Sequence, residues 1–348
     1  MVMGRRPDVE TASAPRTVYA LGSAAFTIGR DVALAGLNAP WKGEADPATN
    51  TRRAFMRGAL KGLLGYAATA PTPDLRSLEI VIDDICSLVL PGPTIRGKVN
   101  VGKIVEGGID CLYVTPATET TGTMLYMHGG GYEATTPKMY TGLAARMAIA
   151  TDCEIVIPDY RMAPEFPYPA ALEDAAAVYQ SLLKTRSPKS IVVGGDSGGG
   201  GLAAALLEDI CIADKPVPSC AVLFSPEVDL SLSGETIRSN VADDILPANI
   251  PVDEYLDGVD PTDPLVSPLY ADPSNFPPMF IVSGAKEMFL DEIERFVANA
   301  RKANVEVDFY NAPDMFHVFE IILPRAQQTK MAIDELTEFV NGHLERRV

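Results

Sequence analysis

Long apolar runs and an excess of positive charge are both missing from this sequence of 348 residues. It contains no uninterrupted apolar run of about 18 residues, so it does not predict a transmembrane helix. Its 46 Asp and Glu outnumber its 29 Lys and Arg, which gives a formal net charge of -17. Nucleic acids and anionic membranes bind basic surfaces, so neither is expected as a partner.

Cysteine and histidine are also scarce. The five scattered cysteines include no CxxC pair and have no histidine nearby, which is typical of reduced thiols and predicts neither a disulfide framework nor a zinc site. We therefore expect a cytoplasmic protein. The stretch Thr51–Arg57 faintly resembles a twin-arginine export signal, but such signals belong at the terminus. It indicates either export or an amphipathic helix with a basic face.

Apolar strands and helical stretches alternate through the later two thirds of the chain. Expected strands are 111–114, 123–127, 154–157, 190–193, 221–224, 279–282 and 305–310. Expected helices are 138–150, 169–184, 200–213, 290–303 and 325–346. Repeated strand-then-helix units with buried strands predict an α/β fold, in which helices cover both faces of a mostly parallel central sheet.

Two parts of the chain depart from this alternation. Residues 17–37 and 51–70 are typical of helices, and residues 231–277 form a proline-rich and acidic interruption. An insert of that length in an α/β domain is usually functional. We expect an α/β domain over 86–230 and 263–348, and a mainly helical part over 1–85 and 231–262 that can serve as a lid.

The stretch GGDSGGGG at residues 194–201 follows a β-branched strand and precedes a helical run. No Lys follows it, as a phosphate-binding P-loop requires, and its spacing does not fit a dinucleotide-binding turn. Residues 195–199 do fit the nucleophile elbow G-x-S-x-G, in which glycines flank a serine held in a strained turn at a helix N-terminus. Ser197 is therefore the expected nucleophile, and a purely structural glycine turn is the alternative.

A serine nucleophile needs a general base, and the chain offers only three histidines. His343 lies in a polar C-terminal helix, and His128 precedes the serine in the chain. His317 follows the last expected strand. The order serine, acid, histidine of α/β-hydrolase sites selects His317 as the base.

The carboxylate that orients His317 is expected on the loop after strand 279–282. Glu287 lies on that loop, while Asp291 lies about one turn into the following helix. A loop carboxylate reaches a distant imidazole more easily, so Glu287 is preferred and Asp291 is the alternative. Asp314 is too close in sequence to the histidine to orient it comfortably.

An oxyanion intermediate also needs preorganised backbone donors. The stretch HGGG at residues 128–131 directly follows an expected strand and can expose its amides toward the nucleophile. The expected donors are the amides of Gly130, Gly131 and Gly198, with the Gly129 amide as a further candidate, and His128 is expected to anchor the loop.

Several motifs resemble, in order, those of the hormone-sensitive-lipase-like esterases, the bacterial family IV of the α/β-hydrolases. The matching stretches are HGGGY at 128–132, DYRMAPE at 159–165, PAALEDA at 169–175, GDSGG at 195–199 and DPLVSPL at 263–269. The resemblance implies an α/β-hydrolase fold with a helical cap and a substrate-contacting Tyr132. Because family members are often dimers, it also implies a homodimer as one oligomeric form. It further implies scaffold roles near the site for Asp159, Arg161, Glu165 and Asp196.

Three positions depart from the family pattern. Glu287 stands where the family usually has Asp, and Gly198 stands where it has Ala. Glu227, in the stretch SPEVDL, replaces a residue that is often aromatic or apolar. We expect Glu227 to be a solvated loop acid; if it faced the pocket instead, it would tune substrate choice.

Together these residues predict a serine carboxylesterase that acts on small-molecule esters and needs no metal or cofactor. The resemblance implies short or medium acyl chains. Two alternatives stay open. One is a small-molecule receptor on a hydrolase scaffold, which would be inert toward activated esters. The other is an amidase with the same residues, which a comparison of ester and amide substrates would reveal.

Overall fold

The apolar strands of the sequence form one eight-stranded sheet in the computed structural model, which describes residues 10–37, 47–89 and 95–345. The order of the strands across the sheet is β1-β2-β4-β3-β5-β6-β7-β8. The strands are β1 (Val99–Glu106), β2 (Ile109–Pro116), β3 (Gly122–Met127), β4 (Cys153–Pro158), β5 (Ile191–Asp196), β6 (Cys220–Phe224), β7 (Met279–Gly284) and β8 (Val307–Ala312).

The strands from β4 to β8 in this order are parallel, while β1 and β2 pair antiparallel with each other and β2 pairs antiparallel with β4. The predicted α/β fold with a mostly parallel sheet is thus confirmed. All the expected strands are present, as β2 to β8. β1 was not expected, because most of its side chains are exposed at the sheet edge and give only a weak apolar pattern.

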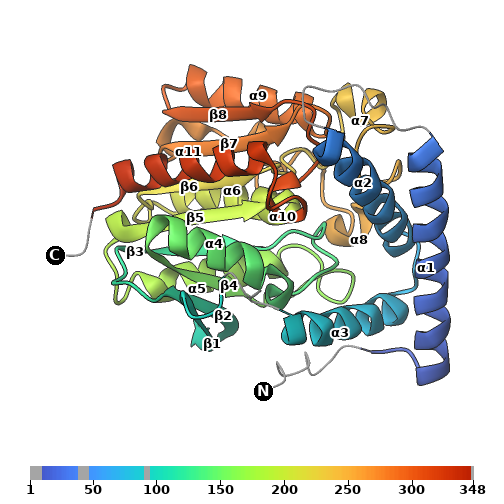
Figure 1. Cartoon of the computed structure of the whole chain (residues 1–348). Coiled ribbons are helices and arrows are strands. Elements are labelled where there is room, and N and C mark those ends of the chain that lie inside the picture. The colour runs from blue at the N-terminus through green and yellow to red at the C-terminus, as the bar shows by residue number, and fades with distance from the viewer. Residues whose placement is uncertain (1–9, 38–46, 90–94, 346–348) are drawn as a thin grey trace.

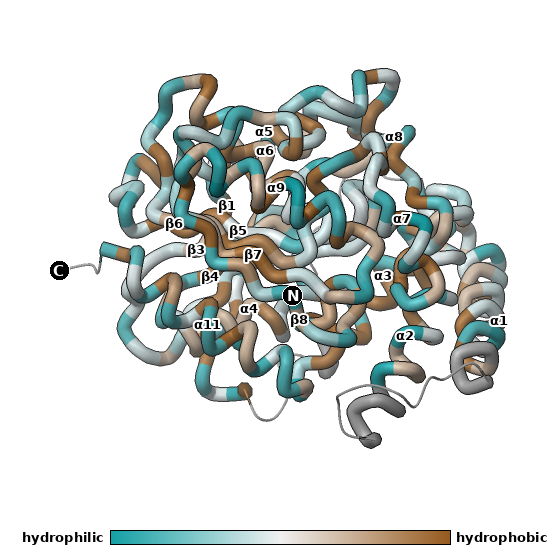
Figure 2. The backbone as a smooth tube through the Cα atoms, turned by 90° about the horizontal axis from the view of Figure 1, so that it is seen from above, coloured by the Kyte–Doolittle hydropathy of each residue, from teal (hydrophilic) through white to brown (hydrophobic). Residues whose placement is uncertain are grey.

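Helices cover both faces of the sheet, as Figure 2 shows. One face carries α4 (Thr141–Thr151) and α11 (Gln327–His343). The opposite face carries α5 (Ala170–Leu182), α6 (Ser197–Ile212) and α9 (Leu290–Lys302). Each face therefore has its own core of buried apolar side chains.

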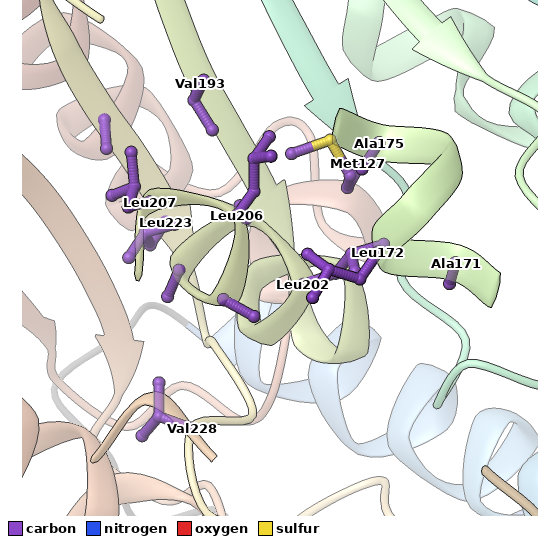
Figure 3. Packing of buried hydrophobic residues seen from close by; sticks show 14 of the residues in the cluster. Met127, Ala171, Leu172, Ala175, Val193, Leu202, Leu206, Leu207, Leu223 and Val228 are labelled. Atoms are coloured by element: carbon purple, nitrogen blue, oxygen red, sulfur yellow. The ribbon is translucent and has the colours of Figure 1, made fainter. Parts of the chain in front are cut away.

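Helix α6 is the most enclosed of these helices, and nearly all of its residues are buried. Its leucines Leu202, Leu206 and Leu207 meet apolar side chains of α5 and of strands β3, β5 and β6 (Figure 3). A helix that is apolar on all sides is stable only when it is surrounded in this way. The packing fixes α6 in place, and with it the first residue of the helix, Ser197.

Three helices precede the sheet, namely α1 (Ala14–Leu37), α2 (Pro47–Ala67) and α3 (Thr72–Val89). They pack together beside the sheet, next to the short insert helices α7 (Thr236–Ser239) and α8 (Asp253–Leu256) (Figure 1). α1 and α2 correspond to the two expected N-terminal helices, whereas α3 was not expected. The predicted domain limit at residue 85 falls inside α3, so we propose a boundary after Val89 instead.

The remaining helices of the described chain are short. They are α10 (Phe319–Ile322) and 3-10 turns at Pro137–Tyr140, Pro188–Ser190, Pro268–Tyr270 and Pro273–Asn275. Within residues 10–37, 47–89 and 95–345, no helix combines the length and the apolar character that crossing a bilayer requires.

Candidate active site

Ser197 lies at the sharp turn between β5 and α6, with a φ of +54°. A side chain in this left-handed region is strained, and the packing of α6 holds it there. The flanking glycines are required by close backbone contacts. A Cβ on Gly199 would lie 2.3 Å from the carbonyl oxygens of Met127 and His128, and one on Gly195 would lie 2.2 Å from the carbonyl oxygen of Gly199. The GDSGG stretch therefore forms the strained turn expected of a nucleophile elbow.

His317 faces this serine from the loop between β8 and α10. Its Nε2 lies 2.8 Å from Ser197 Oγ, within hydrogen-bond distance. The side chain is buried beside the edge of the Phe289 ring, at a centroid distance of 5.1 Å. Burial lowers the pKa of the imidazole to about 3, so the ring is neutral at neutral pH and free to accept a proton.

Glu287 lies on the other side of the imidazole, with its Oε2 3.8 Å from His317 Nδ1. The same oxygen accepts hydrogen bonds from Ser225 Oγ at 2.6 Å and from the Gly284 amide at 3.0 Å. Burial and the nearby Asp244 carboxylate raise the pKa of Glu287, and these two hydrogen bonds oppose the rise. Glu287 is thus held within reach of the histidine by groups on two neighbouring loops.

The two other candidate acids are placed differently. Asp291 lies in the first turn of α9 and pairs with Arg295 at 3.7 Å. The nearest cation to Asp314 is Arg53 of α2, at 3.9 Å. Among the residues that the structure describes, no hydrogen bond or ion pair joins either carboxylate to the His317 side chain. The geometry brings Glu287, and not Asp291, next to the histidine.

Asp244 is a further residue at this site, and sequence reasoning missed it. It belongs to the insert and is fully buried. Its carboxylate accepts three backbone N–H groups, those of Ile245 at 2.7 Å, His317 at 3.0 Å and Met288 at 2.6 Å. No sequence spacing marks Asp244, because its donors Met288 and His317 lie 44 and 73 residues further along the chain.

The glycine loop after β3 lies against the other side of the serine. Gly130 and Gly131 have φ values of +123° and +61°, which favour glycine. A Cβ on Gly198 would lie 3.1 Å from the Gly131 backbone, so the two turns are in contact. In the described chain, the amides of Gly130 and Gly131 donate to no protein group. Free amides next to the candidate nucleophile form an arrangement that can accept an oxyanion.

Buried side chains hold this glycine loop in place. The Asp196 carboxylate accepts the hydroxyls of Tyr126 and Tyr140, both at 3.0 Å, and the Gly129 amide at 3.1 Å. The His128 ring stacks on Tyr160 at 4.3 Å. Both placements agree with the scaffold role expected of Asp196 and with the anchoring role expected of His128.

A model of a protein family described as having the alpha/beta hydrolase fold matches residues 124–321, more than half of this chain. The chain belongs to the α/β-hydrolase family. This hydrolase is 35% identical to an acetyl-hydrolase of Streptomyces hygroscopicus over 242 residues, which are 68% of this chain and 81% of that protein. It is 32% identical to an esterase of Acinetobacter venetianus over 76% of this chain and 88% of that protein.

Solved structures resemble the hydrolase as well. An esterase from the bacterial hormone-sensitive lipase family matches it with a TM-score of 0.72 and 29% identity, over 83% of this chain and 98% of that one. A hormone-sensitive lipase from a metagenome library matches with a TM-score of 0.73 and 30% identity, over 80% of this chain and 95% of that one. The resemblance inferred from the motifs is confirmed.

A cavity of about 240 Å³ opens onto Ser197 and His317 of the hydrolase. Its floor includes Gly130 and Gly131. Its walls are mostly apolar and come from α2, α3 and the insert, through Leu60, Leu64, Leu75, Ile245, Leu246 and Ile250. The N-terminal helices and the insert therefore enclose the space next to the candidate nucleophile.

Two sequence expectations differ from what lies around this cavity. Glu227 is not a solvated loop acid: only 2% of it is exposed, and it lines the cavity. Glu227 is enclosed because its backbone amide donates a hydrogen bond to the Ser197 carbonyl oxygen at 3.0 Å. This bond holds the loop of Glu227 against the nucleophile elbow. Tyr132 was expected to contact substrate, but its ring stacks on Tyr255 of α8 at 3.9 Å and is absent from the cavity lining.

Proposed function

We propose that this hydrolase is a serine carboxylesterase that cleaves short- to medium-chain esters through an acyl-enzyme. Ser197 attacks the ester carbonyl, and His317 takes its proton and passes it to the leaving alcohol. Glu287 orients the imidazole and stabilises the imidazolium. Water then cleaves the acyl-enzyme by the same steps in reverse, with His317 again serving as the base.

The observation that carries this proposal is the contact of 2.8 Å between Ser197 Oγ and His317 Nε2 at a strained strand-to-helix turn. The free amides of Gly130 and Gly131, with that of Gly198, supply the oxyanion hole. Losing one such donor typically costs roughly 3 kcal/mol of transition-state stabilisation. The acetyl-hydrolase and esterase relatives support ester hydrolysis, and the small, mostly apolar cavity supports short or medium acyl chains.

Three further assignments belong to this proposal. The cap consists of α1 to α3 and of the insert, and its helices α2 and α3 and the insert line the cavity. The five cysteines are free thiols, which supports a cytoplasmic location. The homodimer implied by the family resemblance stays a prediction.

The test is hydrolysis of p-nitrophenyl butyrate by the wild type and by Ser197→Ala, Glu287→Ala and Asp291→Ala, after circular dichroism has shown that each folds. We expect kcat to fall by about 10³-fold or more for Ser197→Ala and by about 10²-fold or more for Glu287→Ala. Asp291→Ala is the matched control, since it removes a nearby carboxylate that does not contact His317, and it should keep kcat within about threefold. Loss of activity in Asp291→Ala but not in Glu287→Ala would assign the acid role to Asp291 instead of Glu287. An inert wild type would refute the proposal.

A further inference from the structure

The described residues that line the cavity next to Ser197 include several acids and, apart from His317, no basic side chain. Of the described residues that line it, Glu133, Asp196 and Glu227 carry carboxyl groups, and none is Lys or Arg. Asp196 is accounted for, because two tyrosine hydroxyls and a backbone amide bond its oxygens. Glu133 and Glu227 have no such partners, so they are the groups left to meet a ligand.

Glu227 is only 2% exposed and lines the cavity, and its carboxyl group makes no hydrogen bond to any residue in the described chain. Burial, and then the nearby Glu133, raise the pKa of this carboxyl to about 8. A buried polar group with no partner destabilises a protein by about 1–3 kcal/mol, and by more if it is charged. Such a group is retained at a cavity wall most readily when a ligand satisfies it.

Glu133 presents a second carboxyl group from the end of the glycine loop. Its Oε1 is buried without a hydrogen-bond partner, and burial raises its pKa to about 7. The cation nearest to it, Arg76, is already engaged. The Arg76 guanidinium donates to both oxygens of Glu165, to Glu79 and to the carbonyl oxygens of Glu133 and Ala163. The Glu133 side chain is therefore left without a donor.

We propose that the cavity selects esters that carry a protonated primary amine, which Glu227 and Glu133 bind, each carboxyl group releasing its proton to solvent as the ammonium charge enters. This inference rests on the proposed esterase activity and adds its substrate class. A primary ammonium brings three N–H donors and one positive charge, so it can satisfy oxygens of both carboxyl groups at once. The apolar walls then pack against the methylene groups that join the ammonium to the ester.

Neither a neutral nor an anionic substituent fits these groups as well. A hydroxyl group brings no positive charge, so it cannot favour ionisation of the two carboxyl groups and forms only the weaker neutral hydrogen bonds. A carboxylate on the substrate would be buried beside two acids in a site that holds no Lys or Arg among its described residues, so no cation would compensate its charge. A quaternary ammonium has the charge but no N–H group to donate.

The experiment compares isosteric ester pairs that differ only in an ammonium in place of a methyl group. The acyl pairs are ethyl 3-aminopropanoate with ethyl butanoate, and ethyl 6-aminohexanoate with ethyl heptanoate. The alcohol pair is 5-aminopentyl acetate with hexyl acetate. Hydrolysis is followed by pH-stat at pH 7 with the wild type, Glu227→Gln, Glu133→Gln and, as a matched loss of one surface carboxylate, Glu294→Gln.

For at least one pair, we expect the wild type to show a kcat/KM about 10- to 100-fold higher for the ammonium ester, the range of charge-assisted hydrogen bonds. The ratio should fall toward 1 in Glu227→Gln, fall in part in Glu133→Gln and stay unchanged in Glu294→Gln. If Glu227→Gln does not fold, the wild-type ratios and Glu133→Gln decide.

The possible failures are distinguishable. Hydrolysis of the neutral esters with no preference for any ammonium partner overturns the inference and leaves the proposed function standing. A preference that both glutamine variants retain also overturns it, because the cation is then recognised elsewhere. If no ester is hydrolysed, the proposed function fails. Calorimetric titration of the wild type with each pair then decides whether the cavity still prefers the ammonium.

Discussion

Replacing Asp244 by Asn tests whether the insert positions the two groups that flank the nucleophile. Asp244 Oδ1 accepts the amides of Ile245 and His317, and its Oδ2 accepts the amide of Met288. Met288 directly follows Glu287, so one side chain of the insert holds both the base loop and the acid loop. A change at Asp244 should therefore alter catalysis without altering any group that touches substrate.

The expected magnitude follows from these three hydrogen bonds. Asparagine keeps one acceptor oxygen, which can still serve Ile245 and His317. Its amide nitrogen is a donor and would face the Met288 N–H at the present 2.6 Å. A buried N–H that loses its acceptor costs about 1–3 kcal/mol. If the loss displaces Glu287 and raises the activation free energy by that amount, kcat falls by about 10- to 100-fold, since 1.36 kcal/mol of activation free energy changes a rate about tenfold.

The assay is kcat and KM on p-nitrophenyl butyrate, with a thermal melt of each variant. Asp243→Asn is the matched control, because the adjacent Asp243 faces outward and pairs with Arg57 at 3.4 Å. We expect Asp244→Asn to lower kcat by the stated factor while KM changes by less than about threefold, and we expect Asp243→Asn to change neither. An equal kcat in the two variants would refute the positioning role, even if Asp244→Asn melts at a lower temperature.

Three other predictions concern stability and the cap. Burial raises the pKa of Glu227 to about 8, so the unfolded chain releases this proton from about pH 4.3 upward while the native state keeps it. The free energy of unfolding of the wild type therefore falls across that pH range, whereas Glu227→Gln has no such proton to release. The melting temperature of Glu227→Gln, relative to that of the wild type, should rise between pH 5 and pH 8. Gly199→Ala should abolish folding, as seen by circular dichroism, because of its contacts at 2.3 Å, whereas Gly198→Ala, at 3.1 Å, should fold. Arg76→Lys loses the paired bonds to Glu165 and should melt several degrees lower, with a raised KM.

The parts of this molecule that sequence predicts well are those that local pattern determines. Strands β3 to β7 are short and fully buried, because the parallel part of the sheet is covered on both faces and requires apolar runs. Most helices also show clear limits in the sequence. The elbow, the glycine loop and the late histidine were found for the same reason. Their chemistry depends on residues that are adjacent in the chain or fixed in order.

The parts that sequence missed depend on distant contacts. Glu227 was expected to be a solvated loop acid and Asp244 was not singled out at all, yet both are buried. A carboxylate in a loop carries no local sign of burial, because what encloses it is a segment elsewhere in the fold. The edge strand β1 was missed because a mostly exposed strand has a weak apolar pattern. Helix α3 was missed although its sequence is amphipathic.

The proposed cap does more than cover the cavity, because three of its residues hold the loops of the site. Asp244 of the insert bonds the loops of the base and the acid. Arg76 of α3 bonds the carbonyl oxygen of Glu133, where the glycine loop ends. Lys61 of α2 in turn bonds the Val241 and Asp244 carbonyl oxygens. Since the base loop, the acid loop and the glycine loop each have a support in the cap, a substitution that shifts the cap should change kcat as well as KM. A cover that only shaped the cavity would change KM alone.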